Sequence, residues 1–458
     1  MKRLIKSLLV IIFFILLLAY NSHAEIFEKV IDIGFGNPRN DYAWSMTTYK
    51  DKLYVGTLNT YGGAQIWRSE SGEQNSWHRV GPRFSRNLGV RCMYADGDRA
   101  IYACTSNNLG AQILRSENGE IWTSVVKKGF DNIRNSTIRC MMRYKDYLYA
   151  GCGCNGAKFF RSKNGFRWES VETNPSFEST QVKILGTTKP IINNTMIGEM
   201  AVFNDDLYAF TWTKDADPRS MLVSLRNLNI RENFRELGDF FLFPAPGAFE
   251  VWRSNDGINW EKVVGKNDLY GNGLGFSRHD PDNLNNDMVT SVTIFQGQLY
   301  LGTEHDFGKT SIWRTSEGTR WEKVLDFYEL GEKFNYYVWR LMPFNGKLYV
   351  GTANLGSCKS SGVTGAQIWV SDSGAAGTFY NLVHNGMDGE KVSVMGIEIP
   401  KNYGIRSLAN FRNMLFIGTA TLLDYPVRKS SQSENMKRRR MKLGSSTKVG
   451  CEIWKMIP

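Results

Sequence analysis

The chain has 458 residues, of which 42% are hydrophobic and 22% are charged, and its formal net charge is +11. The N-terminal segment carries +3 and residues 428–448 carry +7, which leaves +1 for the rest of the chain. A nearly neutral body argues against a nucleic-acid-binding protein, so we expect no nucleic-acid partner. The five histidines form no metal-binding motif, and no phosphate-binding glycine loop is present. We therefore expect no metal site and no cofactor.

Residues 1–24 have the pattern of a secretory signal peptide. Three basic residues within the first six positions precede an apolar run from Leu8 to Ala19, and residues 21–24 supply a cleavage site. A membrane-spanning helix needs about 20 apolar residues, which makes this run too short, although an uncleaved anchor is the alternative. We predict a mature chain of residues 25–458 that is secreted or lies in the periplasm or cell envelope, with no transmembrane span after cleavage.

A strand phrase of the type Leu-Tyr-Val-Gly-Thr recurs seven times along the mature chain. The copies are Leu53–Thr57, Ile101–Thr105, Leu148–Cys152, Leu207–Thr211, Leu299–Thr303, Leu348–Thr352 and Leu415–Thr419. A β-rich run precedes each copy, and phrases such as Ile-Trp-Arg-Ser and Trp-Glu-Lys-Val follow. Four short strands repeated about every 47 residues are typical of propeller blades. The sequence therefore predicts an all-β protein, a seven-bladed β-propeller of four-stranded antiparallel blades formed by residues 25–458.

The two ends of the chain predict how the ring closes. The seventh copy has no fourth strand before Pro458, whereas Ile26–Ile31 resembles a fourth strand with no blade before it. We expect the N-terminal strand to complete the last blade, because this pairing leaves no open sheet edge.

The turn between the third and fourth strands carries its own motif. Asn118-Gly119, Asn164-Gly165 and Asp256-Gly257 are pairs that a tight type I′ hairpin requires, so we expect that turn here. The tryptophan three residues after each glycine is expected to pack between blades, because one isolated blade could not cover so large a ring.

The same segments resemble the Asp-box (BNR-type) repeat of sialidase-like propellers, Arg-Ser-x-Asn/Asp-Gly-x-x-Trp. The matches are Arg115–Trp122, Arg161–Trp168 and Arg253–Trp260, with weaker copies at Arg314–Trp321 and Ser371–Gly374. The spacing differs from the family pattern, because the glycine follows the serine by three residues instead of four. In that family the box lies on the turn away from the active site, so the resemblance implies a fold rather than an activity.

Every large insertion falls at one end of the predicted blades. The insertions are residues 172–195, 214–247, 265–287, 353–365, 384–403 and 420–450. Long loops on a rigid scaffold are where binding residues concentrate, so we predict that this face holds the ligand. One insertion includes a stretch, residues 222–241, that could form a short helix. In another, Asp280, Asp282 and Asp287 lack a calcium-loop motif, which favours a solvated loop.

The first strand of each blade begins on this same face, and alignment of the seven copies gives two columns of residues. The first column is Trp44, Arg91, Arg139, Gly198, Thr290, Trp339 and Arg406, and the second is Ser45, Cys92, Cys140, Glu199, Ser291, Arg340 and Ser407. Arginine forks suit carboxylate or phosphate, and indole faces suit sugars or cations. Our candidate ligand-binding residues are Trp44, Arg91, Arg139, Glu199, Trp339, Arg340 and Arg406; a structural lining of a wet channel is the alternative.

These features predict an exported, monomeric binding module that holds a glycan or protein ligand, with an acidic glycan as one ligand class. Whether the chain is an enzyme stays open. The enzymatic alternative is a sialidase-like glycoside hydrolase, for which Glu199 is the catalytic candidate because it is the one acid aligned with the channel mouth.

A third hypothesis is attachment to anionic surfaces through the basic segment 428–448. Its candidate residues are Lys437, Arg438, Arg439 and Arg440, although a solvated loop is the simpler interpretation. Seven cysteines in an exported chain permit up to three disulfides. The matching positions of Cys92 and Cys140, and nearly of Cys104 and Cys152, favour core packing over a metal site, and the disulfide pairing stays open.

Overall fold

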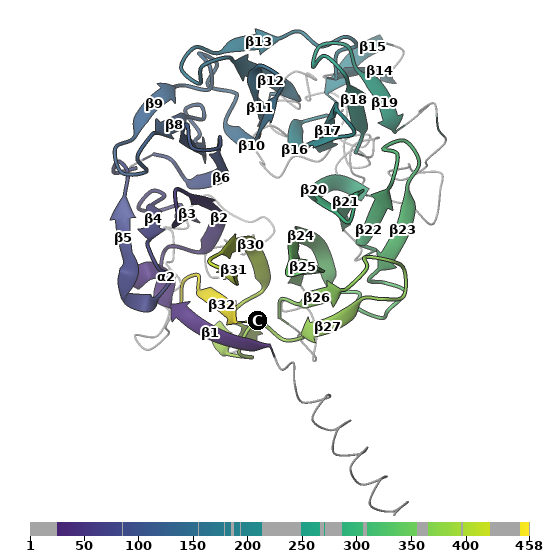
Figure 1. Cartoon of the computed structure of the whole chain (residues 1–458). Coiled ribbons are helices and arrows are strands. Elements are labelled where there is room, and N and C mark those ends of the chain that lie inside the picture. The colour runs from purple at the N-terminus through teal and green to yellow at the C-terminus, as the bar shows by residue number, and fades with distance from the viewer. Residues whose placement is uncertain are drawn as a thin grey trace, which may run out of the picture.

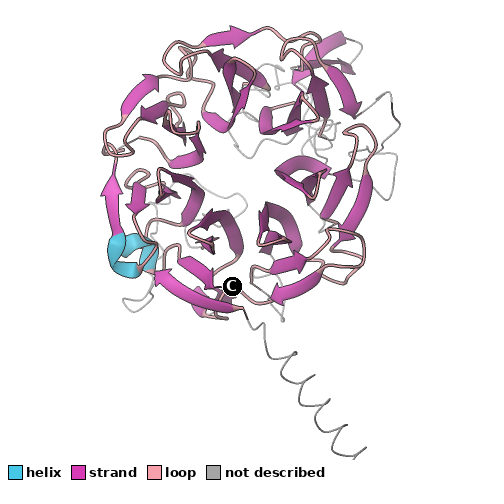
Figure 2. Cartoon of the chain, viewed as in Figure 1, coloured by secondary structure: helices cyan, strands magenta, loops and turns pink. Residues whose placement is uncertain are grey.

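The computed structural model describes residues 25–84, 86–153, 155–177, 179–184, 187–192, 194–212, 249–265, 270, 286–305, 309–354, 365–394, 397–421 and 449–457. Antiparallel strands surround a central axis and form a closed, propeller-like ring (Figures 1 and 2). The described helical elements are two short turns, α2 (Ile33–Gly36) and a 3₁₀ turn (Gln74–Ser76). No helix in this part of the chain is long and apolar enough to cross a membrane. The predicted all-β, propeller-like class is confirmed.

Fourteen strands lie round the axis as seven hairpins. They are β2 (Tyr42–Tyr49) with β3 (Lys52–Leu58), β6 (Gly89–Ala95) with β7 (Ile101–Ser106), β10 (Thr137–Tyr144) with β11 (Tyr147–Gly153), β16 (Met196–Phe203) with β17 (Asp206–Trp212), β20 (Asn286–Phe295) with β21 (Gln298–His305), β24 (Asn335–Phe344) with β25 (Lys347–Asn354), and β30 (Gly404–Phe411) with β31 (Met414–Ala420). One residue pair joins each hairpin to the next, and Tyr42 opposite Ala420 closes the circle. The inner sheet is therefore continuous, in contrast to seven separate blades.

Two outer strands extend each hairpin. They are β4 (Ile66–Ser69) and β5 (Trp77–Val80), β8 (Ile113–Ser116) and β9 (Thr123–Val126), β12 (Lys158–Ser162) and β13 (Glu169–Val171), β18 (Val251–Ser254) and β19 (Glu261–Val264), β22 (Ser311–Thr315) and β23 (Glu322–Asp326), β26 (Ile368–Ser371) and β27 (Tyr380–Val383), and β32 (Ile453–Ile457) and β1 (Ile26–Ile31). We call each set of four paired strands a repeat and number the repeats one to seven from β2 onward.

The chain closes on itself through its first strand. β1 pairs antiparallel with β32, from Ile26 opposite Ile457 to Ile31 opposite Ile453. The pairing expected between the N-terminal strand and the last repeat is therefore present, and β1 lies at the outer rim beside β32 (Figure 1).

The prediction of type I′ hairpins between third and fourth strands is wrong. Type I′ geometry needs two successive residues with φ > 0, and of the pair Asn118-Gly119 only Gly119 has a positive φ. Arg115 pairs with Thr123, so the connection is too long for a two-residue turn. Instead the Ser116 hydroxyl accepts from the Gly119 amide at 2.8 Å, and the Asn118 side chain accepts from two later amides at 2.9 Å. We call this motif the box turn.

The two-residue turns with paired positive φ lie between first and second strands. Lys50 and Asp51 have φ of 47° and 52°, and Asn345 and Gly346 have φ of 46° and 76°. These turns and the box turns lie at the same end of every repeat, because successive strands are antiparallel. We call this end the short-turn face and the opposite end the insertion face.

Tryptophans of the box turn pack between repeats, as expected. Trp260 of repeat four stacks on Phe159 of repeat three, with ring centroids 5.1 Å apart and planes within 4°. Trp122 lies against a cluster that includes Tyr54 of repeat one. Each ring therefore covers the sheet of the preceding repeat, which places aromatic packing between neighbouring sheets.

Two small hairpins lie in the predicted insertions. β14 (Ser179–Ile184) pairs with β15 (Thr187–Ile192), and β28 (Lys391–Val394) pairs with β29 (Ile397–Pro400). The insertion 214–247 with its expected helix, residues Asp280 and Asp282, and the basic segment 428–448 with Lys437, Arg438, Arg439 and Arg440 lie outside the described residues.

Candidate functional site

The first column of candidate residues shares a backbone irregularity that the sequence analysis missed. In all seven hairpins the ladder skips one residue near the start of the first strand, as a β-bulge does. The skipped residues are Trp44, Arg91, Arg139, Gly198, Thr290, Trp339 and Arg406. Because a bulge turns a side chain away from the regular alternation, each repeat can direct this residue differently from its neighbours. The aligned column is therefore one structural position, repeated around the axis.

Arginines and tryptophans of this column stack on one another. The Arg91 guanidinium carbon lies 4.6 Å from the Trp44 ring centroid, and that of Arg406 lies 5.9 Å from it. Arg406 also lies 5.0 Å from the centroid of Trp339. These cation–π contacts join four consecutive repeats, six, seven, one and two, into one layer around the axis.

Trp212, the last residue of β17, extends this layer and was not among the predicted site residues. Its ring centroid lies 3.5 Å from the Arg139 guanidinium carbon and 5.6 Å from that of Arg91. Its indole N–H donates to the Val289 carbonyl at 2.6 Å. A Cβ on Gly198 would lie 2.3 Å from the indole nitrogen, so the glycine leaves the space that this ring fills. In the sequence, this exchange is visible as a glycine in the aligned column, Gly198, together with a tryptophan at the end of the following strand, Trp212.

Two arginines of the layer are almost fully buried. Arg139 is 6% exposed and Arg406 is 4% exposed. Arg139 donates from Nε to the Gly198 carbonyl at 3.2 Å. Among the described residues, the Nη1 atoms of both arginines are buried without a hydrogen-bond partner. Unsatisfied donors in such a place favour an acceptor that comes from outside the described protein.

Charge in this layer is unbalanced. The acid close to it in the described chain is Glu199, whose Oε1 lies 3.3 Å from Nη1 of Arg340. Burial, followed by the nearby Arg91, lowers the pKa of Arg139, whereas Glu199 raises it. Burial, followed by Arg340 and Arg91, lowers the pKa of Arg406. Four guanidinium groups therefore lie close together, and within the described residues Glu199 is the carboxylate that pairs with one of them.

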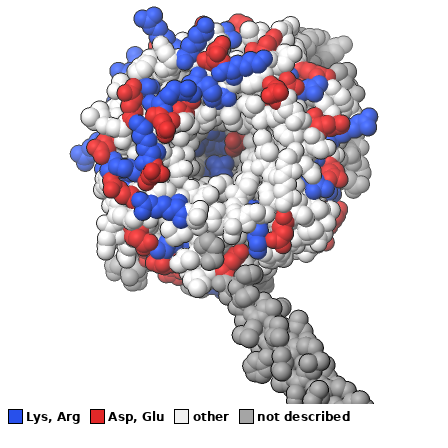
Figure 3. Space-filling model, in the orientation of Figure 1, with Lys and Arg blue, Asp and Glu red and all other residues white. Residues whose placement is uncertain are grey.

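Aromatic rings border the arginines on one side. The Tyr42 and Tyr403 hydroxyls are hydrogen-bonded to each other, and their ring centroids lie 6.0 Å apart. Trp339 lies 5.4 Å from Tyr403 and 5.6 Å from Tyr337, measured between centroids. In the space-filling view, the central hollow has basic and acidic side chains at its floor (Figure 3). The structure thus brings together the seven candidate residues, with Trp212 and the tyrosines added.

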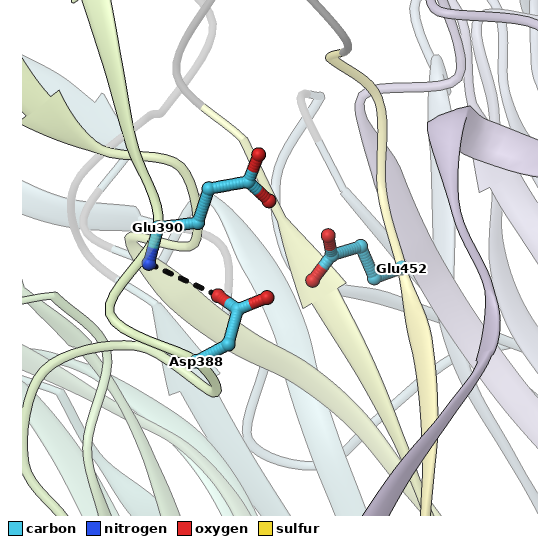
Figure 4. Close-up of side chains that lie close together, drawn as sticks. All are labelled: Asp388, Glu390 and Glu452. Atoms are coloured by element: carbon cyan, nitrogen blue, oxygen red, sulfur yellow. Dashed lines mark hydrogen bonds between the residues drawn. The ribbon is translucent and has the colours of Figure 1, made fainter.

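A separate set of carboxylates lies where the ring closes. Asp388, Glu390 and Glu452 place oxygen atoms close enough to one another to hold a metal ion (Figure 4). Two ammonium groups already contact them: Lys401 lies 2.6 Å from Glu452 and 3.0 Å from Glu390, and Lys29 lies 2.7 Å from Asp388. We therefore assign this cluster to an ion-pair network that holds β1 in place.

Five described cysteines are free thiols: Cys92, Cys104, Cys140, Cys152 and Cys451. All except the partly buried Cys92 are buried, and burial raises the pKa of the Cys104 and Cys140 thiols. The expected core packing of the matching cysteines is confirmed. Cys154 and Cys358 lie outside the described residues.

No protein-family model matches the chain, and no curated protein sequence matches it. Similar solved structures include a luciferin-regenerating enzyme, at 9% identity and a TM-score of 0.43 over 95% of this chain and 96% of that chain. The WD40 β-propeller domain of Doa1 matches at 8% identity and a TM-score of 0.44, over 87% of this chain and 94% of that chain. U3-55K matches at 10% identity and a TM-score of 0.44, over 94% and 98%. These likenesses concern a propeller-like fold alone.

Proposed function

We propose that the chain is a binding module that holds an anionic ligand in the arginine–tryptophan layer at its axis. The observation that supports this most directly is the pair of buried Nη1 atoms on Arg139 and Arg406 that have no hydrogen-bond partner among the described residues. A bound anion would accept hydrogen bonds from both groups and would reduce the repulsion among the four arginines. A neutral ligand could accept the hydrogen bonds but would not reduce the repulsion.

The ligand class that best suits the layer is a carboxylate-bearing sugar. Arginine forks bind a planar carboxylate through two parallel hydrogen bonds, and nearby indole and phenol rings offer faces on which a sugar can pack. The resemblance of the box turns to those of sialidase-like propellers is consistent with this class, although fold alone decides no function. A structural lining of the channel is the alternative that the experiments below must exclude.

We further propose that the seven repeats act as the blades of a seven-bladed propeller and that residues 1–24 direct its export. The protein would then act as a monomer outside the cytoplasm, where glycans and anionic surfaces are accessible. The observations that support this are the sequence pattern of the N-terminal segment and the four-stranded pairing of every repeat.

The first experiment is binding of purified residues 25–458 to an array of acidic and neutral glycans, read for both retention and mass loss. We expect retention on glycans that end in N-acetylneuraminate or glucuronate and not on their neutral counterparts. Arg340→Gln and Arg406→Lys should each weaken binding at least tenfold, because each removes a guanidinium fork. Arg412→Gln, an exposed change in a turn of repeat seven, serves as the control. Equal retention of neutral glycans would contradict the proposal.

Substitution of Glu199 distinguishes a binding module from the enzyme alternative, because the two hypotheses predict different outcomes. If Glu199 is the counter-ion of Arg340, Glu199→Gln should raise the affinity for an anionic ligand several-fold, because a competing negative charge is lost. If the chain is a glycoside hydrolase with Glu199 as its catalytic acid, the same change should abolish product formation. Mass loss by the wild type that survives in Glu199→Gln would remove this catalytic assignment.

The third hypothesis concerns the basic segment 428–448 and has a different readout. Attachment to an anionic surface through that segment would weaken steeply with salt and would disappear when residues 428–448 are deleted. Binding that persists at high salt after this deletion would exclude it.

A further inference from the structure

A second group of basic side chains lies on the short-turn face, at the opposite end of the ring from the insertions. A hollow of about 360 Å³ opens there between repeats two and three. Its basic lining residues are Arg99, Arg115, Arg143, Lys145 and Lys163. Lys and Arg side chains also gather over these repeats in the upper left of the space-filling view (Figure 3).

One buried acid fixes two of the arginines. Asp96 is 3% exposed and accepts hydrogen bonds from Arg99 at 3.0 Å and from Nε of Arg143 at 3.1 Å. The two arginines therefore hold a defined position, which reduces the entropy that they would lose when they contact a ligand. One carboxylate cannot neutralise both guanidinium groups, so this trio keeps a net positive charge.

The two lysines of the hollow contact groups other than carboxylates in the described structure. Lys145 donates to the Asn255 carbonyl at 2.5 Å, and Lys163 lies 5.3 Å from the Tyr147 ring centroid. Within the described part of the chain, neither ammonium group forms an ion pair. The remaining acid in the lining is Asp146, which is exposed. Arg115 pairs with Glu117, which lies beside the hollow, at 2.8 Å. With Glu117 included, five basic and three acidic residues lie in or against the hollow, which keeps an excess of positive charge.

A second hollow of the ring has a different charge. It lies between repeats three and four, has a volume of about 480 Å³, and is lined by Arg253, Asp206 and Glu261 among other residues. Arg253 pairs with Glu261 at 2.5 Å, and with Asp206 this lining has two acids and one base. The excess of basic residues is therefore a feature of the hollow between repeats two and three and is not shared by this second hollow.

We propose that the basic hollow is a second anion-binding site, which takes the phosphate or sulfate ester of a sugar. The arginines and lysines supply the donors that a tetrahedral oxyanion needs. The Arg115 guanidinium carbon lies 4.2 Å from the ring centroid of Phe166, a residue that is 50% exposed. This ring gives the rim an apolar face on which a sugar can pack. The site is independent of the arginine–tryptophan layer.

The test is calorimetric titration of residues 25–458 with glucose 6-phosphate and with glucose 6-sulfate, at low ionic strength, with glucose as the neutral control. We expect at least one ester to bind and glucose not to bind, and we expect binding to weaken as salt is added, because the charges are exposed. The ester that binds more tightly identifies the group. The double change Arg99→Gln with Lys163→Gln should weaken binding at least tenfold.

Two further variants keep the test specific. Asp146→Asn removes a negative charge from the rim and should strengthen binding several-fold. Arg412→Gln, an exposed change on the same face in repeat seven, should leave binding of the ester unchanged. Binding of neither ester to the wild type, or equal binding to the double variant, would overturn the proposal. Loss of ester binding in Arg340→Gln would instead place the ester in the axial layer.

Discussion

At the scale of single residues, the axial layer depends on a missing side chain at one position, whose space the side chain of another residue fills. Six repeats place a side chain at the bulge, and repeat four places Gly198 there. The indole of Trp212 enters the space that the missing Cβ leaves, and it stacks on Arg139. The site is therefore completed by a residue from a different strand position, and a change at Gly198 should disturb the arginine without touching it.

Gly198→Ala tests this exchange. The new Cβ would lie 2.3 Å from the Trp212 indole nitrogen and 3.0 Å from the Val289 carbonyl, so the ring must move and its hydrogen bond must weaken. We expect a loss of about 1–3 kcal/mol in the free energy of unfolding, as for other overpacked cores. Urea unfolding followed by tryptophan fluorescence measures this loss. Trp212→Phe should offset part of it in the double variant, whereas strictly additive losses would contradict the clash.

Asp256 is a residue whose charge the box turn stabilises. Partial burial opposes ionisation, but hydrogen bonds from the Asn259 side chain and from the Ile258 and Asn259 amides outweigh it, and the pKa falls to about 2. A carboxyl with a lowered pKa in the folded state contributes stability above its unfolded pKa of about 3.9, and the contribution is lost as pH falls toward 2.

Asp256→Asn should therefore flatten the decline in stability between about pH 4 and pH 2. Asparagine is a matched replacement, because repeats two and three use Asn118 and Asn164 at the same place and keep the turn. The measurement is the difference in unfolding free energy between wild type and variant across this pH range. A difference that does not change with pH would show that the charge is not stabilised by the turn.

At the scale of the element, the box turn joins one repeat to the previous one. Its glycine lies against a tyrosine of the second strand of the preceding repeat: Gly119 against Tyr54, and Gly165 against Tyr102. A Cβ on Gly165 would lie 1.9 Å from the Tyr102 hydroxyl oxygen. The glycine is needed twice, once for its positive φ and once for this close approach.

Gly165→Ala and Gly346→Ala separate the two requirements, because both glycines have a φ of 76°. Nothing lies within 4 Å of a Cβ on Gly346, so its change should cost only the backbone term of about 1 kcal/mol. Gly165→Ala should cost at least about 2 kcal/mol, since it also displaces Tyr102. Thermal and urea unfolding measure both values. Equal losses would mean that the contact between repeats adds nothing.

At the scale of the whole molecule, the ion-pair network around β1 stabilises the closure of the ring that strand pairing forms. Lys401 and Glu452 have fully buried side chains and lie 2.6 Å apart, and Lys29 of β1 contacts Glu452 at 2.9 Å. Strand pairing gives β1 its place, and these buried charges restrict it further. Removal of one partner would leave an uncompensated charge in the interior.

Lys401→Met should lower the free energy of unfolding by about 3–5 kcal/mol, because Glu452 would lose its closest cation. Lys323→Met is the control, since Lys323 forms surface pairs with Asp326 and Glu329, and it should cost about 1 kcal/mol or less. Guanidinium unfolding of both variants gives the comparison. Restoration of stability by Glu452→Gln in the Lys401→Met background would confirm that the buried charge is the cause.

The sequence by itself determined the repeated strands, the closure by β1 and the column of arginines and tryptophans. These features follow from local patterns, because alternation and turn residues act over a few positions and an internal repeat brings equivalent residues to equivalent places. Only the tertiary structure decided the continuous inner ring, the true form of the box turn, the part of Trp212 in the layer and the charge of the hollow between repeats two and three. The form of the box turn follows from local hydrogen bonds to Ser116 and Asn118, which the Asn-Gly pair by itself does not distinguish from a type I′ hairpin. The other features depend on contacts between neighbouring repeats, where packing space and buried charge are set by side chains about 50 or more residues apart that no local pattern relates.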